Sequence, residues 1–147
     1  MLLPLLITFH VLAATVWTGG HLILSLRVLP KAIKEQSAKQ ISDFEKIFEP
    51  LALPALAVQA ITGLWMTWIY LPGGNGLFSF ETPITALITT KLLLFAITIA
   101  LAVHARLRLI PKLTNENIIG LAWHIRSITT VSVGLVVIGS GIRLGGF

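Results

Sequence analysis

Cysteine is absent from the 147-residue chain, and methionine occurs only twice, at Met1 and Met66. Without cysteine the chain can form no disulfide, no thiolate metal site and no covalent haem attachment through a C-x-x-C-H motif. Soft Cu(I) prefers thiolate and thioether ligands, so the scarcity of sulfur weighs against a Cu(I) conduction path. An imidazole site for copper remains open.

Charged residues are scarce as well. They make up 12% of the chain, and the mean hydropathy is +0.88, whereas soluble domains carry about 25% charged residues. Four apolar segments approach the criterion of about 18 residues for a membrane-spanning helix: residues 2–29, 51–71, 83–107 and 118–144. The first segment lacks the basic start and small-residue cleavage site of a secretory signal, so we expect it to be the first helix of the mature protein. We therefore predict a single all-α integral membrane domain over residues 1–147, an up-down bundle of four transmembrane helices.

Basic residues cluster in two of the three connections between these segments. Lysine and arginine in short loops set membrane orientation, because they are retained on the cytoplasmic side. The second connection has only Glu81 as a charged residue, whereas the first and third contain or adjoin eight of the eleven basic residues: Arg27, Lys31, Lys34, Lys39, Lys46, Arg106, Arg108 and Lys112. We expect a multi-pass protein of the cell inner (cytoplasmic) membrane with both termini non-cytoplasmic. The net charge of +5 is then a topology signal and predicts no nucleic-acid partner.

Prolines divide the connections. The first connection is long and mixed in charge, and we expect it to hold a short interfacial helix before Pro50 and Pro54. Pro30 and Pro111 lie in the similar stretches RVLPK and RLIPK. They predict the ends of the first and third helices, beside basic residues that face the cytoplasm.

Two histidines lie inside the first apolar segment, where each imidazole needs a hydrogen-bond partner or a ligand. At about 100° per residue, His10 and His21 share one stripe of the helix with Ala14 and Trp17. A rise of about 1.5 Å per residue separates the two histidines by roughly 16 Å, too far for one metal ion. We favour a ligand role for both, at different depths in the bundle.

A lysine lies inside the third segment. Lys91 shares a stripe with small residues, and that stripe allows close approach of another helix or of a flat cofactor: Thr98, Ala102 and Ala105. Counted from the segment ends, Lys91 and His10 lie at matched depths, about 12 Å inside the non-cytoplasmic edge. We expect this face to point inward, although a long side chain at that depth can also snorkel to the surface.

The other two histidines are less clearly directed. His104 shares its face with apolar residues, so the pattern does not settle where it points. His124 lies beside a small and polar stripe of the fourth segment, and we expect it to lean toward lipid or headgroups. That stripe consists of Gly120, Trp123, Ser127, Thr130 and Gly134. For both histidines, a hydrogen bond to another helix is the alternative to a cofactor role. The second segment has its expected inner face at Gln59, Thr62, Gly63 and Met66.

Imidazoles inside a helical bundle suit two chemistries. A b-type haem can lie between facing helices with axial histidine ligands. Its propionates would pair with Lys91 on one side or with arginines on the other: Arg106, Arg108 and Arg126. Direct copper binding by imidazole is the alternative.

Four stretches of the chain resemble a known family. The first helix, FHVLAATVWTGGHLILSLRVLP, is similar to the opening signature of the bacterial copper-resistance D (CopD) family, and the stretches AITGLW, TTKLLLFAITIALAVHARLRLIPK and HIRSITTVSVGLVVI also look like that family's domain. The resemblance implies an inner-membrane protein of copper handling, often beside a periplasmic copper-binding partner. The domain also resembles the HemJ-type protoporphyrinogen oxidases, which bind b-type haem, and this second relationship implies functional weight for His10 and Lys91.

From these observations we predict a membrane redox protein that binds b-type haem through helix histidines and transfers electrons within or across the membrane, with a haem-dependent oxidoreductase activity left open. The alternatives are CopD-like copper transport or resistance, and an accessory subunit of a larger membrane complex. The expected partners are the lipid bilayer and either a redox partner or a periplasmic copper-binding protein, and a homo-oligomer is open. The candidate cofactor-binding residues are His10, His21, His104, Lys91 and His124, of which His10, His21 and His104 are the candidate metal ligands.

Overall fold

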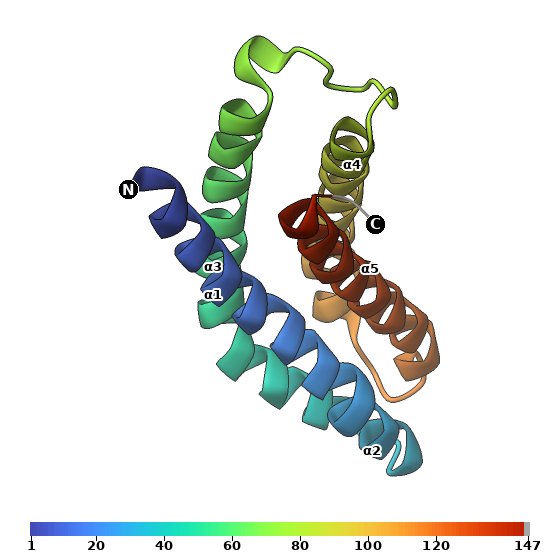
Figure 1. The fold of residues 1–147 in the computed structure, drawn as a ribbon. Coiled ribbons are helices and arrows are strands. Elements are labelled where there is room, and N and C mark those ends of the chain that lie inside the picture. The colour runs from blue at the N-terminus through green and yellow to red at the C-terminus, as the bar shows by residue number, and fades with distance from the viewer. Residues whose placement is uncertain (146–147) are drawn as a thin grey trace.

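Every regular element is helical in the computed structural model, which describes residues 1–145. Within those residues four continuous helical rods are long and apolar enough to cross a membrane: residues 2–34, 38–70, 83–112 and 118–144 (Figure 1). The prediction of an all-helical chain with four helices able to span a membrane is confirmed for these residues.

The first rod continues past its predicted end at residue 29. α1 (Leu2–Ile23) passes through a π-helical segment (Leu24–Val28) into α2 (Leu29–Lys34), so Pro30 lies inside the rod. Proline has no N–H to offer the carbonyl four residues earlier. A π turn shifts the hydrogen-bond pairing locally and lets the helix continue.

The third rod repeats this arrangement and also outruns its predicted end, at residue 107. α4 (Pro83–His104) continues into a π-helical segment (Ala105–Leu109) and then a 3₁₀ turn (Ile110–Lys112) that contains Pro111. At the other end of α4, Thr82 and Thr85 form a reciprocal capping box. The two similar stretches RVLPK and RLIPK therefore overlap π turns within rods: RLIPK finishes its rod at Lys112, and RVLPK finishes at Lys31, shortly before its rod ends at Lys34.

The second rod is a single helix. α3 (Ala38–Tyr70) includes the stretch expected to be a separate interfacial helix, and both Pro50 and Pro54 lie inside it. The predicted start at residue 51 is therefore wrong. Because the helix is continuous, Glu45 and Glu49 lie on the same rod as the intramembrane residue Gln59.

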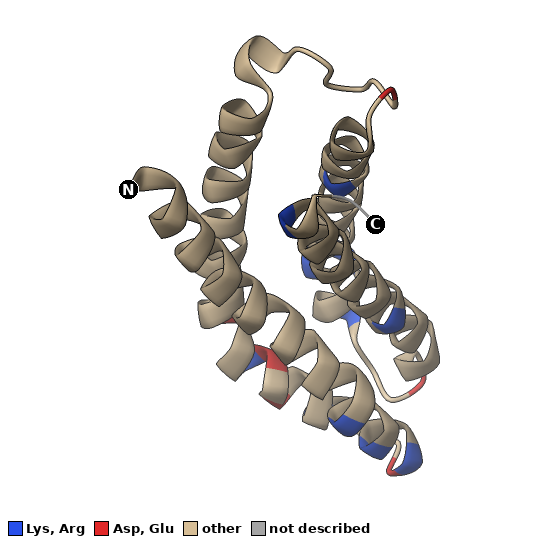
Figure 2. Cartoon of the chain, viewed as in Figure 1, with Lys and Arg blue, Asp and Glu red and all other residues tan. Residues whose placement is uncertain are grey.

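The rods are arranged as two pairs. α1 packs against α3, α4 packs against α5 (Ile118–Leu144), and the pairs meet where α1 contacts α5 (Figure 1). The start of α1, the end of α5 and loop 71–82 lie toward one end, here called the terminal end. Connections 35–37 and 113–117 lie at the other, the basic end, toward which most Lys and Arg residues lie along the chain (Figure 2).

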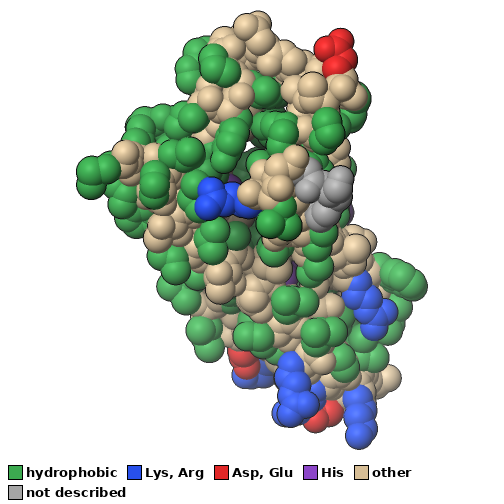
Figure 3. Space-filling view, in the orientation of Figure 1, with side chains coloured by type: hydrophobic (Ala, Val, Ile, Leu, Met, Phe, Trp, Pro, Cys, Tyr) green, Lys and Arg blue, Asp and Glu red, His purple; other side chains and the backbone are tan. Residues whose placement is uncertain are grey.

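Much of the helical surface stays uncovered. In the most apolar stretch of each rod only 17–33% of the residues are buried, and apolar side chains spread over the outside of the molecule (Figure 3). In a bilayer such a surface contacts lipid, and helices associate through close packing rather than through expulsion of water. The main buried cluster lies at the basic end, where Leu24, Leu29, Ile41 and Ile125 meet.

The inward faces of three rods match the sequence pattern, and that of α5 does not. Trp17 and His21 of α1, Gln59 and Thr62 of α3, and Thr98 of α4 are all buried. On α5 the predicted small and polar stripe is largely exposed, whereas the buried face carries Ile125, Ile128, Thr129, Ser132 and Leu135. The hydroxyls of Ser127 and Thr130 instead donate to carbonyls of their own helix, so these polar residues can face lipid.

Candidate functional site

Two cavities lie inside the bundle. The large cavity, of about 510 Å³, lies toward the terminal end and includes His10, Lys91 and Arg143 in its wall. The small cavity, of about 80 Å³, lies toward the basic end and includes His21 and His124. Among the described residues Trp17 alone lines both cavities. The indole therefore forms the partition between them.

Trp17 is fixed on both sides. Its indole Nε1 donates to Ser132 Oγ of α5 at 3.0 Å, and its ring lies 4.5 Å from the His21 ring. Only 4% of its surface is exposed. Because a buried indole N–H needs an acceptor, this bond joins α1 to α5 at the level of the partition.

His10 faces the large cavity with a defined tautomer. Its Nδ1 lies 2.8 Å from Thr62 Oγ1, and the Thr62 hydroxyl donates to Val58 O at 2.6 Å. Since that hydroxyl has a single hydrogen, His10 Nδ1 must donate to it, which leaves the lone pair of the neutral ring on Nε2. Gly63 makes room for the ring, because a Cβ at that position would lie 3.2 Å from His10 Cε1.

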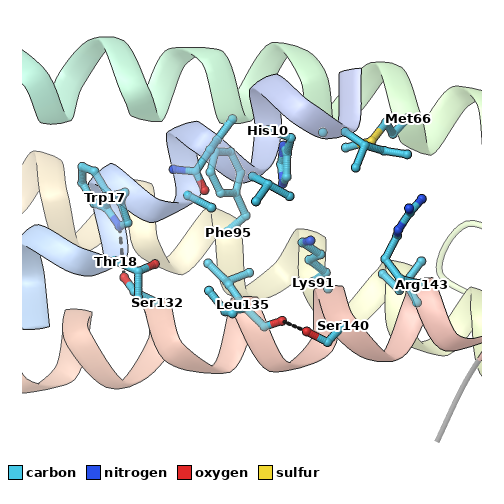
Figure 4. A pocket seen from close by; sticks show the side chains of 18 of the residues that line it. His10, Trp17, Thr18, Met66, Lys91, Phe95, Ser132, Leu135, Ser140 and Arg143 are labelled. Carbon is cyan, nitrogen blue, oxygen red and sulfur yellow. Dashed lines mark hydrogen bonds between the residues drawn. The ribbon is translucent and has the colours of Figure 1, made fainter. Parts of the chain in front are cut away.

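Lys91 points into the same cavity from α4, as its small-residue stripe predicted, and does not snorkel to the surface (Figure 4). Its Nζ approaches α5 at Gly139, where an added Cβ would lie 2.8 Å from it. Arg143, one turn further along α5, also lines the cavity and was missed by the sequence analysis. Its place in the same cavity wall as Lys91 depends on the packing of α4 against α5, which one helix's periodicity does not reveal.

His21 lines the small cavity and is buried. Its Nδ1 lies 2.8 Å from Trp17 O, and its ring meets the Phe48 ring edge-on at 5.4 Å. A carbonyl oxygen can only accept, so Nδ1 carries the proton and the lone pair of the neutral ring is on Nε2.

His124 also faces the bundle, and the expectation that it leans toward lipid or headgroups is wrong. Its Nε2 lies 2.8 Å from Leu101 O of α4, so Nε2 carries the proton and the lone pair is on Nδ1. His104 is exposed, and its ring lies 5.3 Å from the His124 ring. The structure therefore brings His104 beside His124, but leaves His10 and His21 in separate cavities.

Two carboxylates complete the small cavity. Glu45 and Glu49 of α3 line it together with Arg106, which forms an ion pair with Glu49. Sequence reasoning placed these acids outside the bundle because the prolines at positions 50 and 54 suggested a break. The signal that locates them is the helical register, which is continuous from Ala38 to Tyr70.

Neither cavity presents a preformed multidentate metal site or a paired-histidine haem site. Residues 1–145 contain no group of three or more His, Cys, Asp or Glu side chains placed to hold a metal ion. Organic ligands occupy pockets of about 300–1,000 Å³, so the small cavity cannot accept a porphyrin between His21 and His124. The large cavity is big enough, but of the described residues only His10 lines it with an imidazole. A haem with two histidine ligands does not fit this arrangement.

Comparison with known proteins gives one family. The family model described as "Copper resistance protein D" matches residues 42–142, which include most of α3, all of α4 and most of α5. No curated protein and no solved structure matches the chain. The matched range includes Lys91, His104 and His124, whereas His10 and His21 precede it.

Proposed function

The chain belongs to the copper resistance protein D family, and from that premise we propose that this multi-pass membrane protein binds copper ions inside its bundle and conducts them across the membrane. Copper is here the cargo. The observation that carries the proposal is the pair of imidazole lone pairs, on His21 Nε2 and His124 Nδ1, around one small cavity.

The hydrogen bonds of these two histidines support a ligand role. A metal-binding imidazole generally donates its other ring nitrogen to a carboxylate or a backbone carbonyl, which fixes the tautomer and the ring orientation. His21 does so to Trp17 O, and His124 does so to Leu101 O. Imidazole is a suitable ligand for copper, so two histidines can bind it in a cavity that no cysteine or methionine of residues 1–145 lines.

Charge favours the same cavity. Two carboxylates, Glu45 and Glu49, and one guanidinium, Arg106, line it. This leaves one negative charge in excess, and a cation that enters a low-dielectric site needs such compensation. Copper would pass between this cavity and the large one only when the Trp17 partition moves. The proposed copper site does not include His10 or His104, whose ligand role stays a prediction from the sequence.

The leading sequence prediction, a b-type haem protein of electron transfer, is not supported by the family match or by the cavity geometry. A HemJ-type relationship likewise stays a prediction. The accessory-subunit alternative is distinguished by the histidine variants below, since it predicts that all of them are tolerated.

Copper binding by histidine variants tests the proposal. Purified protein in non-ionic detergent is titrated with Cu(I) against a competing chelator. We expect His21→Ala and His124→Ala each to weaken copper binding by more than about tenfold, because loss of a residue that only hydrogen-bonds to a metal ligand already lowers metal affinity by about that factor. His10→Ala is the matched control in the large cavity and should keep its affinity. Unchanged affinity in both small-cavity variants would overturn the proposal, and a haem absorption spectrum would restore the haem prediction.

Cysteine labelling tests the membrane orientation. We propose that both termini are non-cytoplasmic and that the protein lies in the cell inner membrane, because most Lys and Arg residues lie toward the basic end. The chain has no cysteine of its own, so Asn75→Cys in loop 71–82 and Glu116→Cys at the basic end each introduce one reactive thiol. In cells with a permeable outer envelope, a membrane-impermeant maleimide should label the first and not the second. Labelling of the second variant and not of the first would show that the protein has the opposite orientation in the membrane.

A further inference from the structure

The large cavity has a charge opposite to the one that copper needs. Lys91 and Arg143 line it, and none of the described lining residues is an Asp or a Glu. The neutral His10 ring contributes an acceptor at Nε2, which does not offset two cationic side chains. A bare cation is therefore disfavoured in this cavity, and an anionic group is favoured.

A buried amide in the same wall lacks a partner. Gln59 lines the large cavity and is 8% exposed, and its Nε2 has no hydrogen-bond acceptor within residues 1–145. Buried polar groups in folded proteins are nearly always paired, and an unpaired donor costs free energy. An acceptor-bearing ligand in the cavity would satisfy this donor.

The cavity has its cationic side chains at one end, and the rest of its wall is mostly apolar, with the polar side chains of Thr18, Gln59 and Ser132 among the exceptions. Lys91 and Arg143 lie toward one end, Trp17 lies at the other, and Phe95 and Leu135 lie between them (Figure 4). Gly139 keeps Lys91 in this place, because a side chain there would collide with Nζ. The cationic end is the one nearer the terminal end of the bundle, where the headgroup of a molecule in that leaflet would lie.

We propose that the large cavity binds a single-chain amphipathic carboxylate, such as a fatty acid from the surrounding leaflet. Its carboxylate pairs with Lys91 and Arg143, and its apolar chain lies along Phe95 and Leu135 toward Trp17. Charge-assisted hydrogen bonds to ammonium and guanidinium groups select the ionised acid. The inference does not rest on copper binding by His21 and His124, because these residues line the other cavity.

The test uses parinaric acid, a fluorescent fatty acid, and its methyl ester, which keeps the chain and lacks the charge. Binding to the purified full-length protein in non-ionic detergent is followed by energy transfer from tryptophan to the probe. We expect the acid to bind about tenfold more tightly than the ester, because the gain in affinity from one charge-assisted hydrogen bond is of about that size. Lys91→Gln and Arg143→Gln should each remove most of that difference.

Arg126→Gln is the matched control, because Arg126 lies on α5 over the Trp123 ring and does not line the large cavity. It should leave the preference for the acid unchanged. If Lys91→Gln fails to fold, Arg143→Gln at the exposed rim carries the test alone. Equal binding of acid and ester by the unmodified protein, or an equal loss in Arg126→Gln, would overturn the proposal. Copper affinity measured on the same samples reports separately on the small cavity.

Discussion

Replacing Trp17 with alanine is expected to destabilise the bundle by about 3 kcal/mol, the lower end of the range for large-to-alanine changes in a packed interior. The lower end applies because helices in a bilayer gain little from transfer out of water and depend on packing and hydrogen bonds. The change removes the α1–α5 bond to Ser132 and the contact with His21. It also removes the partition between the two cavities, so copper should leak through the variant in liposomes.

The measurements are unfolding in mixed micelles and passive copper flux in proteoliposomes. Trp123→Ala is the matched control, since Trp123 lies on α5 with 68% of its surface exposed. Trp17→Phe keeps an aromatic ring at the partition but loses the indole N–H and part of the ring volume, so it should lose stability with a smaller leak than Trp17→Ala. If Trp17→Ala proves as stable and as tight as Trp123→Ala, the partition role is wrong.

Replacing Gly20 with alanine is the second change with a large expected effect. A Cβ at Gly20 would lie 2.0 Å from Phe48 Cε2, which requires the ring to move. Phe48 is buried against Trp17, Ala52 and Ile128, so the ring has little free space. Overpacking of this kind costs about 1–3 kcal/mol. Because Phe48 also contacts the His21 ring, we expect weaker Cu(I) binding as well as lower stability.

The neighbouring glycine supplies the control. A Cβ at Gly19 would meet nothing within 4 Å, and alanine is the better helix former by about 1 kcal/mol. Gly19→Ala should therefore be neutral or stabilising in the same unfolding assay. Equal effects of Gly19→Ala and Gly20→Ala on stability would show that helix propensity, and not the contact with Phe48, determines the change in stability at both glycines.

The sequence predicted the inward faces of α1, α3 and α4 because residues on those rods that need burial recur at helical spacing. His10, Trp17 and His21 lie on one stripe, and the structure places all three inside the bundle. The same reasoning failed on α5, where His124 was expected to lean toward lipid because it lies beside the small and polar stripe. Serine and threonine can satisfy their hydroxyls on their own helix, as Ser127 and Thr130 do, so polarity alone did not fix the direction.

Prolines gave the other misreadings. Pro30, Pro50 and Pro54 all lie within continuous helices, although each suggested a boundary. In the first rod a π turn re-pairs the backbone beside the proline.

By itself the sequence determined that the chain crosses a membrane four times and that imidazoles lie within the spans, because hydrocarbon demands long apolar helices and tolerates few polar groups. Only the tertiary structure decided which side chains meet. It placed His10 in one cavity and His21 and His124 in another, brought Glu45 and Glu49 to the second, and brought Arg143 and Lys91 to the first. Helical periodicity fixes the direction of a residue on its own rod, whereas these groupings depend on how the rods are rotated and paired, and that is set by packing between residues far apart in the chain.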